Sequence, residues 1–406
     1  MKIFMILYAS IAPGRANSDL YSLIKELLSR GHKVVVMARS DEYQKGTIKI
    51  GDLILVSIYP HKIITWILLY PYMLLRTLIR ALKERPDVII SSKSMVLPIA
   101  FIVSRVLKRP LVILFRETLA ENLVYKYTNV LVRTLGILLY HIELHFLRAL
   151  RAPILAIDEG LYALASNLYK AKVLLMRYPV SISVTNKLSV TTSNRNVVIV
   201  YSGRISKDRN IEMLIDAFCC IIEELDHDKM NRVKLVITGY GEWNYLLRYL
   251  RTKPQACQAK IHVYRGWLRR KEVLDILFNS DVGVETFQRR FPECIQLGTK
   301  VVDYLLTGNI ILVPKDPYYE YLYNIVNNMI RTIMGERSIN VVLTYNSKHI
   351  EDLKEKIKLA VSLCHKVDKE VRLSISNVLK QLFDPHKALI KVYKGIKMAI
   401  ISVKYD

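Results

Sequence analysis

Short, almost wholly apolar runs alternate with helical stretches along this chain, and the alternation constrains the fold more than any other feature. In the first half, apolar runs at 3–8, 32–38 and 110–115 are separated by helical segments such as 17–30. Apolar strands of this kind are typical of a parallel sheet covered by helices on both faces. The first half is therefore predicted to be a doubly wound α/β domain.

The same alternation starts again after a polar break. Residues 178–196 are rich in Ser, Thr and Asn and carry no β or α periodicity, which indicates a linker. Strands are expected again from 197, with helices between them. The predicted organisation is an N-terminal domain at 1–180, a linker at 181–196, a C-terminal domain at 197–385 and a helical tail at 386–406.

The N-terminus and the cysteines bear on the cellular compartment. MKIFMILYASIA has some features of a signal peptide, but a helix and a second strand follow directly, which favours a buried first strand. The longest uncharged apolar run, 63–75, falls short of the roughly 20 residues that span a bilayer, so no transmembrane helix is expected. The cysteines are five and scattered; we expect no disulfide framework, no zinc site and a reducing, cytoplasmic location.

The charge balance points to anionic partners. Lys and Arg number 60 against 36 Asp and Glu, a formal net charge of +24, which favours phosphate, anionic lipid or nucleic acid. Two apolar segments with basic edges, 61–80 and 123–151, have two interpretations. They are core helices packed on the sheet, or they lie peripherally on an anionic membrane at its inner face.

The segment from Tyr201 to Phe218, YSGRISKDRNIEMLIDAF, carries the most specific pattern. A strand ends at Gly203, the cations Arg204 and Arg209 flank a short loop, and a helix starts near Asn210. Two fixed cations beside a helix N-terminus suit a diphosphate. The segment resembles the G-R-x-x-x-x-K-G-x-x-x-L-I-x-A-F element of retaining glycosyltransferases of family 4, with Arg209 at the Lys position and Asn210 at the Gly position.

Downstream segments follow the order of that family. Residues 236–242 resemble its strand with a Gly-x-Gly turn, and 261–268 resemble its base-contacting loop. The segment 297–313 resembles T-K-x-x-E-Y-x-x-x-G-x-P-V, with Asp303 at the second Glu of the E-x7-E motif, which binds the ribose hydroxyls. Ile295 replaces the first Glu, which leaves the donor-sugar contact in doubt, although Glu293 lies nearby.

In the first half, residues 12–18 stand at the position of the family's Gly-rich loop, and 110–121 resemble an R-D-x-W-P-E stretch found in some members that build polysaccharides and lipid-linked glycans. The resemblance implies these candidate residues. Catalytic candidates are Arg204, Arg209 and Glu117. Donor-binding candidates are Gly14, Gly203, Lys207, Gly239, Gly241, Gly266, Trp267, Leu268, Thr299, Lys300 and Asp303. Acceptor candidates are Arg15, Arg116 and Glu121.

The resemblance implies the GT-B fold, two Rossmann-like domains, and a retaining, metal-independent transfer of sugar from a UDP- or GDP-sugar to a glycan or lipid-linked acceptor. No cofactor and no metal are expected, because the arginines supply the charge that stabilises the leaving group. Three alternatives stay open: a nucleic-acid-binding protein, a GT-B sugar-nucleotide epimerase and a non-catalytic homologue. For nucleic acid, the sequence offers net charge but no recognised motif.

Overall fold

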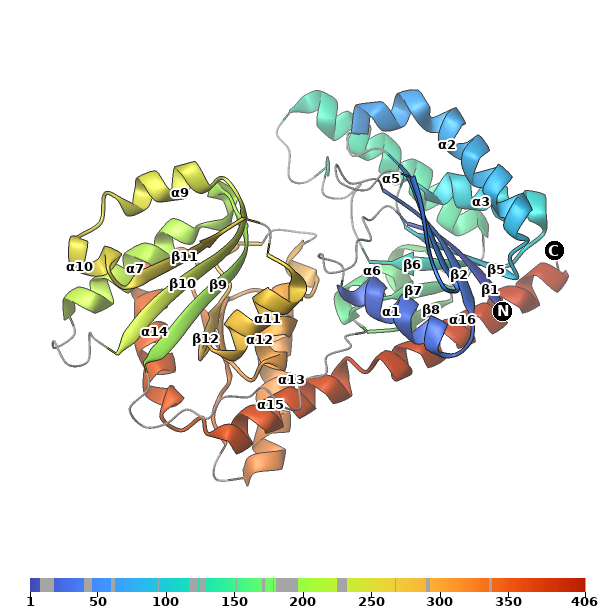
Figure 1. The fold of residues 1–406 in the computed structure, drawn as a ribbon. Helices are drawn as coiled ribbons and strands as arrows, with labels where there is room; N and C mark the ends of the chain where they lie inside the picture. Colours follow the sequence, from blue (N-terminus) through green and yellow to red (C-terminus); the bar gives the residue numbers. More distant parts are fainter. Residues whose placement is uncertain are drawn as a thin grey trace. The chain divides into compact units, whose positions relative to one another are not determined.

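The computed structural model describes residues 1–7, 18–39, 46–59, 63–93, 95–116, 123–124, 129–150, 152–169, 172–177, 179, 196–224, 232–266, 268–289, 293–335 and 338–405. The chain divides into two compact units. Unit 1 comprises Met1–Ser181, Phe291–Gln296 and Phe383–Asp406, and unit 2 comprises Ile182–Arg290 and Leu297–Leu382. Each unit is an α/β body with its own sheet (Figure 1), as the alternation in the sequence predicted.

Unit 1 is built on an 8-stranded sheet with the order β3-β4-β2-β1-β5-β6-β7-β8. The strands are β1 (Lys2–Ile6), β2 (Lys33–Arg39), β3 (Gly46–Ile50), β4 (Leu53–Tyr59), β5 (Val88–Ser92), β6 (Leu111–Phe115), β7 (Ile154–Ala156) and β8 (Val173–Leu175). All pair in parallel except β3, which runs antiparallel to β4 at the sheet edge. Strand β3 was not predicted, because its mostly exposed sequence GTIKI lacks a continuous apolar run.

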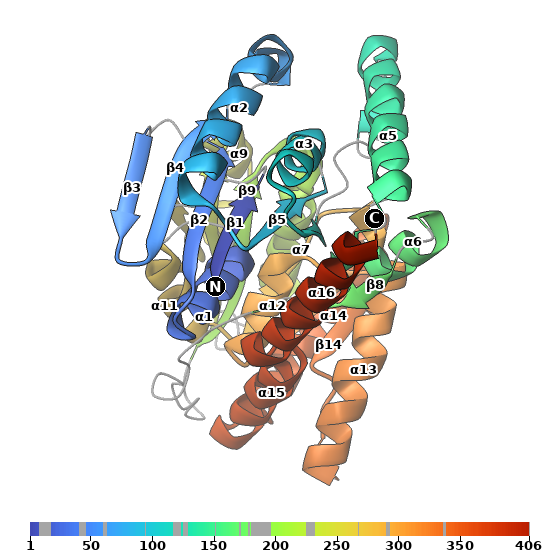
Figure 2. The same cartoon turned by 90° about the vertical axis from the view of Figure 1, so that its right-hand side faces the viewer.

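Helices cover both faces of this sheet. They are α1 (Ser18–Ser29), α2 (Ile63–Glu84), α3 (Leu97–Leu107), α5 (Val130–Leu150), α6 (Glu159–Tyr169) and α16 (Pro385–Tyr405). Helix α16 packs on α1, β6 and β7, so the end of the chain completes unit 1 (Figure 2). Helices α2, α3 and α5 form a layer on the other face (Figure 1).

Unit 2 has a six-stranded parallel sheet with the order β11-β10-β9-β12-β13-β14. The strands are β9 (Val197–Ile205), β10 (Val233–Gly241), β11 (Ile261–Arg265), β12 (Val282–Val284), β13 (Ile310–Pro314) and β14 (Val342–Tyr345). The helices are η1 (Lys207–Arg209), α7 (Ile211–Glu224), α9 (Trp243–Leu250), α10 (Gln255–Gln258), α11 (Arg270–Phe278), α12 (Thr299–Leu306), α13 (Pro317–Met334), α14 (Ile350–Cys364) and α15 (Lys369–Leu382). The short η2 (Glu293–Ile295) belongs to unit 1.

The strand order of unit 2 reverses between β9 and β12, because the chain builds outward from β9 in one direction and then returns to its other side. Ligands of doubly wound sheets bind at such a switch point, beyond the carboxyl ends of the strands. Residues that follow β9 and β12 are therefore the first place to look for a site.

Two further findings differ from the sequence-based expectations. Cys219 of α7 and Cys257 of α10 form a disulfide, so the expectation of no disulfide was wrong: their separation of 38 residues hid a pairing that only the fold brings together. The second finding concerns α5, which over Val130–Arg148 is long and apolar enough to cross a membrane by length and composition, with 17% of the stretch buried. Because α5 packs on α3 and α6 within unit 1, meeting this criterion does not overturn the expectation that no helix spans a membrane.

Candidate functional site

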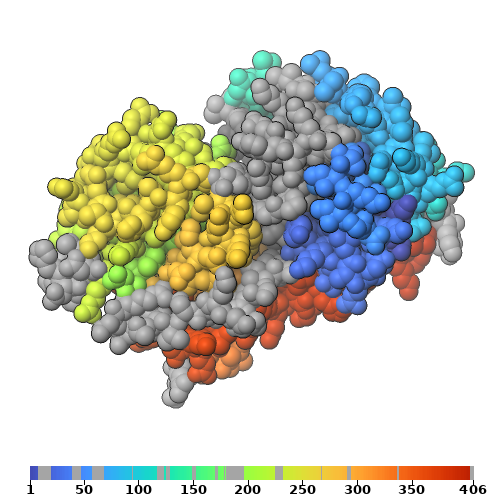
Figure 3. All heavy atoms as spheres, in the orientation of Figure 1, coloured from blue at the N-terminus to red at the C-terminus, as the bar shows by residue number. Residues whose placement is uncertain are grey.

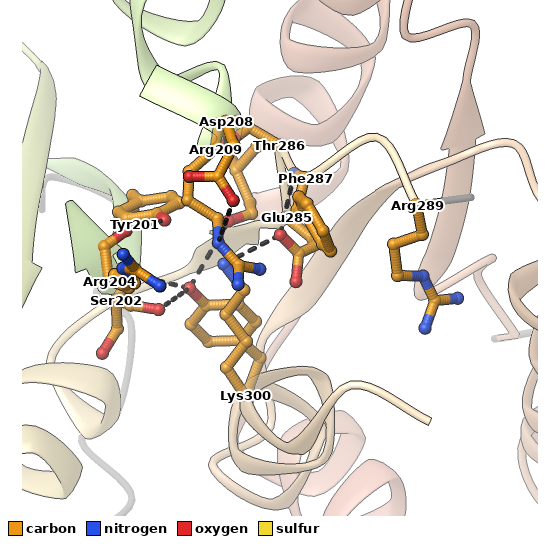
Figure 4. A network of polar contacts seen from close by, with 12 residues as sticks. Tyr201, Ser202, Arg204, Asp208, Arg209, Glu285, Thr286, Phe287, Arg289 and Lys300 are labelled. Carbon is orange, nitrogen blue, oxygen red and sulfur yellow. Dashed lines mark hydrogen bonds and ion pairs between the residues drawn. The ribbon is translucent and has the colours of Figure 1, made fainter. Parts of the chain in front are cut away.

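The carboxyl ends of β9 and β12 carry a cluster of charged and aromatic side chains (Figure 4). From the β9 side come Tyr201, Arg204 and Arg209, and from the β12 side comes Glu285. Lys300, in the first turn of α12, reaches the same place from below. The fold thus gathers these residues at the topological switch point of unit 2.

Lys300 is held by a buried counter-ion. Its ammonium lies 2.8 Å from an oxygen of Glu285, whose side chain is 3% exposed, and 4.2 Å from the centre of the Tyr201 ring. Burial lowers the pKa of Lys300, and Glu285 offsets part of this effect. Glu285 is fixed in turn, because it accepts a hydrogen bond from the backbone N–H of Phe287 at 2.9 Å.

Arg209 is the second cation of the cluster. Its guanidinium stacks on Phe287, 3.8 Å from the ring centre, and Thr286 donates a hydrogen bond to its backbone carbonyl. The Nε atom is buried and has no hydrogen-bond partner among the described residues; it lies 3.7 Å from a carboxylate oxygen of Asp208. A buried donor without a partner is unusual and suits a site that an anion completes.

Arg204 and Lys207 lie on the outer side of the same turn and are exposed. The ammonium of Lys207 sits 5.4 Å from the ring centre of Tyr245, over a surface pocket whose described lining includes Trp243 and Arg248. Arg204 points toward the cluster in Figure 4. Asn210 adopts the left-handed conformation, with φ of 51°, which explains why the family pattern has Gly at this position.

The predicted glycines fall at two kinds of position. At Gly239 a Cβ atom would lie 1.6 Å from the carbonyl oxygen of Gly203, and at Gly241 it would lie 2.2 Å from that of Ile205. Both glycines therefore let the ends of β9 and β10 approach each other. Gly203 itself lies directly over Lys300, whose ammonium would be 3.4 Å from an added Cβ. Gly266 has open space around it.

Asp303 is already engaged within the protein. Its buried carboxylate accepts hydrogen bonds from both terminal nitrogens of Arg270, which lies in the first turn of α11. Burial would lower the pKa of Arg270, but the Asp303 carboxylate outweighs this and raises it. Asp303 was predicted to bind the ribose hydroxyls, and its pairing with Arg270 was not predicted. Leu268 precedes α11 and is half-buried, and Thr299 is the first residue of α12 and is exposed.

The position of the missing first Glu has a structural counterpart. Ile295 lies in η2, and its carbonyl oxygen would be 1.7 Å from a Cβ added to Gly160 in α6. The η2 segment is thus packed closely on α6 within unit 1. In the same unit, Arg116 lies half-buried directly after β6. Gly14, Arg15, Glu117, Glu121 and Trp267 lie outside the described residues.

Three charged residues near the switch point were not predicted from the sequence: Glu285, Arg270 and Arg289. Arg289 pairs with Asp316 at 2.7 Å, and both side chains are largely buried. Arg289 also stacks on Tyr319, 3.7 Å from the ring centre. A buried Glu directly after an apolar strand was the one available indication of Glu285. The other pairs join residues that are distant in sequence.

No group of three or more His, Cys, Asp or Glu side chains able to hold a metal ion occurs among the residues that the structure describes. The positive charge at the switch point comes from Arg204, Arg209 and Lys300, and the buried negative charge beside it comes from Glu285. The arrangement can accept an anion and polarise it, because the cations are fixed by packing before any ligand arrives.

Comparison with known proteins gives structural matches only. No protein-family model and no curated protein matches the sequence. Sucrose-phosphate synthase from Thermosynechococcus elongatus superposes with a TM-score of 0.70 at 10% identity, covering 99% of this chain and 100% of that one. HepE from Anabaena in complex with UDP-glucose gives 0.67 at 13%, covering 97% and 99%. WaaG, a glycosyltransferase involved in lipopolysaccharide biosynthesis, gives 0.62 at 14%, covering 95% and 98%. The fold expected from the sequence is therefore confirmed: the chain has the GT-B fold.

Proposed function

We propose that this protein is a glycosyltransferase of the retaining family 4 type, which transfers a sugar from a nucleotide-sugar to an acceptor. The observation that carries the proposal is the cluster at the switch point of unit 2, where Arg204, Arg209 and Lys300 come together at the carboxyl ends of β9 and β12. Structural relatives crystallised with UDP or UDP-glucose support a nucleotide-sugar as the donor.

In the proposed reaction the donor diphosphate lies over Gly203, with Arg209 and Lys300 on its phosphates and Arg204 at its outer side. Negative charge grows on the departing nucleoside diphosphate as the sugar bond breaks, and these cations stabilise it. This is the step for which other enzymes use a metal ion, and the proposal assigns it to side chains. Glu117 and the acceptor candidates Arg15, Arg116 and Glu121 belong to unit 1 and keep their proposed roles there.

The ribose contact proposed for Asp303 needs one adjustment. Because Arg270 already occupies its carboxylate, the hydroxyls would meet the pair rather than a free carboxylate. The proposal keeps UDP and GDP as donor nucleotides and keeps retention of anomeric configuration, which NMR of the product tests directly.

The decisive experiment measures donor turnover by wild type and by Arg204→Ala. Losing one stabiliser of a leaving group costs about two to three decades in turnover, so we expect that loss for Arg204→Ala. Arg251→Ala, an exposed arginine after α9, is the matched control and should keep full turnover. Undiminished turnover in Arg204→Ala would refute the assignment.

The same assay separates the alternatives. An epimerase would interconvert free sugar nucleotides without transfer, and a non-catalytic homologue would do neither. A thermal-shift screen against UDP and GDP reports binding even without turnover, because a ligand at about 100 times its Kd stabilises the folded state by about 2.7 kcal/mol. Loss of the shift in Arg209→Ala links the binding to the cluster.

We also propose that unit 1 rests on an anionic membrane. Apolar side chains are exposed along α2 and α5, including Leu68 at 74% and Leu131 at 80%, and exposed arginines such as Arg76 and Arg133 lie on the same helices. Figure 3 shows α2 at the surface of unit 1, in blue. An apolar face with basic neighbours suits the interface of an anionic bilayer, and the location we propose is the cytoplasmic side of a membrane.

A further inference from the structure

Unit 1 contains an apolar cavity of about 340 Å³ between α2, α3 and α5. Its described walls come from all three elements: Tyr70, Met95, Pro98, Leu139, Ile142 and Phe146. Phe146 is held in place by Phe101 of α3, with ring centres 5.3 Å apart. The cavity therefore belongs to a packed helical layer and lies wholly within one unit.

One charged residue, Glu143, lines the cavity among the residues described. Its carboxylate lies 3.0 Å from the ammonium of Lys93, which also sits 4.8 Å from the ring centre of Phe115. Both charged side chains are almost completely buried. Because the two charges compensate each other, the wall offers hydrocarbon and aromatic surface to a ligand rather than a charge.

The inner end of the cavity is close to the carboxyl edge of the sheet. Lys93 directly follows β5, and Met95 is two residues further on. The strand order of unit 1 reverses between β1 and β5, so this edge is where a doubly wound sheet binds its ligand. A chain in the cavity would thus have one end at the ligand-binding edge of unit 1.

The outer side is continuous with the exposed apolar faces of the same helices. Leu69 and Leu138, next in sequence to the lining residues Tyr70 and Leu139, are 42% and 56% exposed. Arg76 and Arg133 are exposed on these helices and supply positive charge. Protein interiors are close-packed, and large apolar voids destabilise them. Water is a poor occupant of a cavity with few polar partners, so an apolar ligand suits this cavity better than water does.

We propose that this cavity binds the hydrocarbon chain of the acceptor, which would make the acceptor a lipid with an anionic, phosphate-bearing head group. The apolar walls account for the chain. The exposed Arg76 and Arg133 do not line the cavity, but their positive charge on the same helices favours an anionic lipid over a neutral one. The adjacent sheet edge gives the head group its place within unit 1. The inference rests on the proposed glycosyl transfer and adds the chemical class of its acceptor.

The test uses the full chain and farnesyl phosphate, kept monomeric, with binding measured by calorimetry. Ile142→Trp fills the cavity and should weaken binding at least tenfold. Ile401→Trp adds the same ring to α16 on the other face of the sheet, where Ile401 is 47% exposed, and should leave binding unchanged. Wild-type affinity in Ile142→Trp, or no binding of farnesyl phosphate to the wild type, would overturn the proposal.

Two further arms keep the outcome interpretable. If Ile142→Trp unfolds the protein, Leu139→Phe narrows the cavity with a smaller change and should again weaken binding. The thermal shift that UDP induces serves as an independent readout. If the wild type shows no such shift, the proposed glycosyl transfer is contradicted. If the wild type shows the shift but does not bind farnesyl phosphate, only the proposed role of the cavity is contradicted. If phosphatidylglycerol vesicles fill the cavity and farnesyl phosphate does not compete, the chain belongs to the bilayer, and the acceptor assignment is wrong.

Discussion

At the scale of single residues, the proposed donor site contains a buried lysine whose charged form a facing carboxylate favours. Lys300 contacts Glu285 at 2.8 Å and lies among the charged groups Arg209 and Arg289, which disfavour its charged form. Burial and these arginines lower its pKa, and Glu285 raises it in part. Glu285 thus extends the pH range over which Lys300 stays charged.

This balance predicts the pH dependence of nucleotide binding. Because the pKa of Lys300 is lowered from 10.5, raising the pH should deprotonate it below that value and weaken UDP binding on the alkaline side. Glu285→Gln removes the group that raises the pKa, so the loss should begin at a lower pH. Lys300→Arg stays charged throughout and should abolish the alkaline loss. Calorimetric titration with UDP across this range measures all three.

If UDP binding weakened at the same alkaline pH in wild type and in Glu285→Gln, this account would be contradicted.

Lys300 and Arg209 were predicted from the sequence because both stand in local patterns of spacing. It could not find Arg270 beside Asp303, since 33 residues separate them and only the packing of α11 on α12 joins them. The left-handed conformation of Asn210, in contrast, could be expected from the sequence, because Asn210 replaces a Gly of the pattern.

At the scale of helices and strands, the apolar runs predicted most elements because buried parallel strands are apolar along their whole length. The pattern fails where burial is partial or a strand is short. Strand β14 (VLTY) is a sheet-edge strand and was not among the predicted strands. Gly283 shows a constraint that no pattern reveals: a Cβ there would lie 2.4 Å from the ring of Tyr304, so the glycine lets α12 pack on β12.

The disulfide between α7 and α10 also belongs to this scale. Cys219 and Cys257 are 38 residues apart, and a link across such a loop stabilises by up to about 4 kcal/mol in the chain-entropy account. We expect dithiothreitol to lower the Tm of the oxidised protein, and Cys257→Ala to have the lowered Tm with no further response. Differential scanning calorimetry measures both.

The neighbouring Cys220, a free thiol, supplies the control: Cys220→Ala should keep the full response to dithiothreitol. Five titratable thiols in the unreduced, denatured protein would show instead that the bond does not form. The helix pair would then be held by packing alone.

At the scale of the whole molecule, net charge and exposed apolar surface act together. The formal charge of +24 gives long-range attraction to any polyanion, which sequence could predict but could not assign to one partner. The structure adds location: Leu68 of α2 and Leu131 of α5 are among the most exposed apolar side chains of unit 1. Charge alone would favour nucleic acid equally, whereas this apolar surface favours a bilayer.

Flotation with vesicles distinguishes the two contributions. At low salt the protein should float more completely with phosphatidylglycerol vesicles than with neutral ones. At 1 M salt the screening length falls to about 3 Å, so flotation should drop but persist in part, because the apolar contact is not screened. Leu68→Ser combined with Leu131→Ser should remove the salt-resistant fraction, and Ile401→Ser, exposed on α16, should not. A protein that never floats with anionic lipid has no membrane-binding face, and its charge must then serve another polyanion, which a salt-dependent gel shift would reveal.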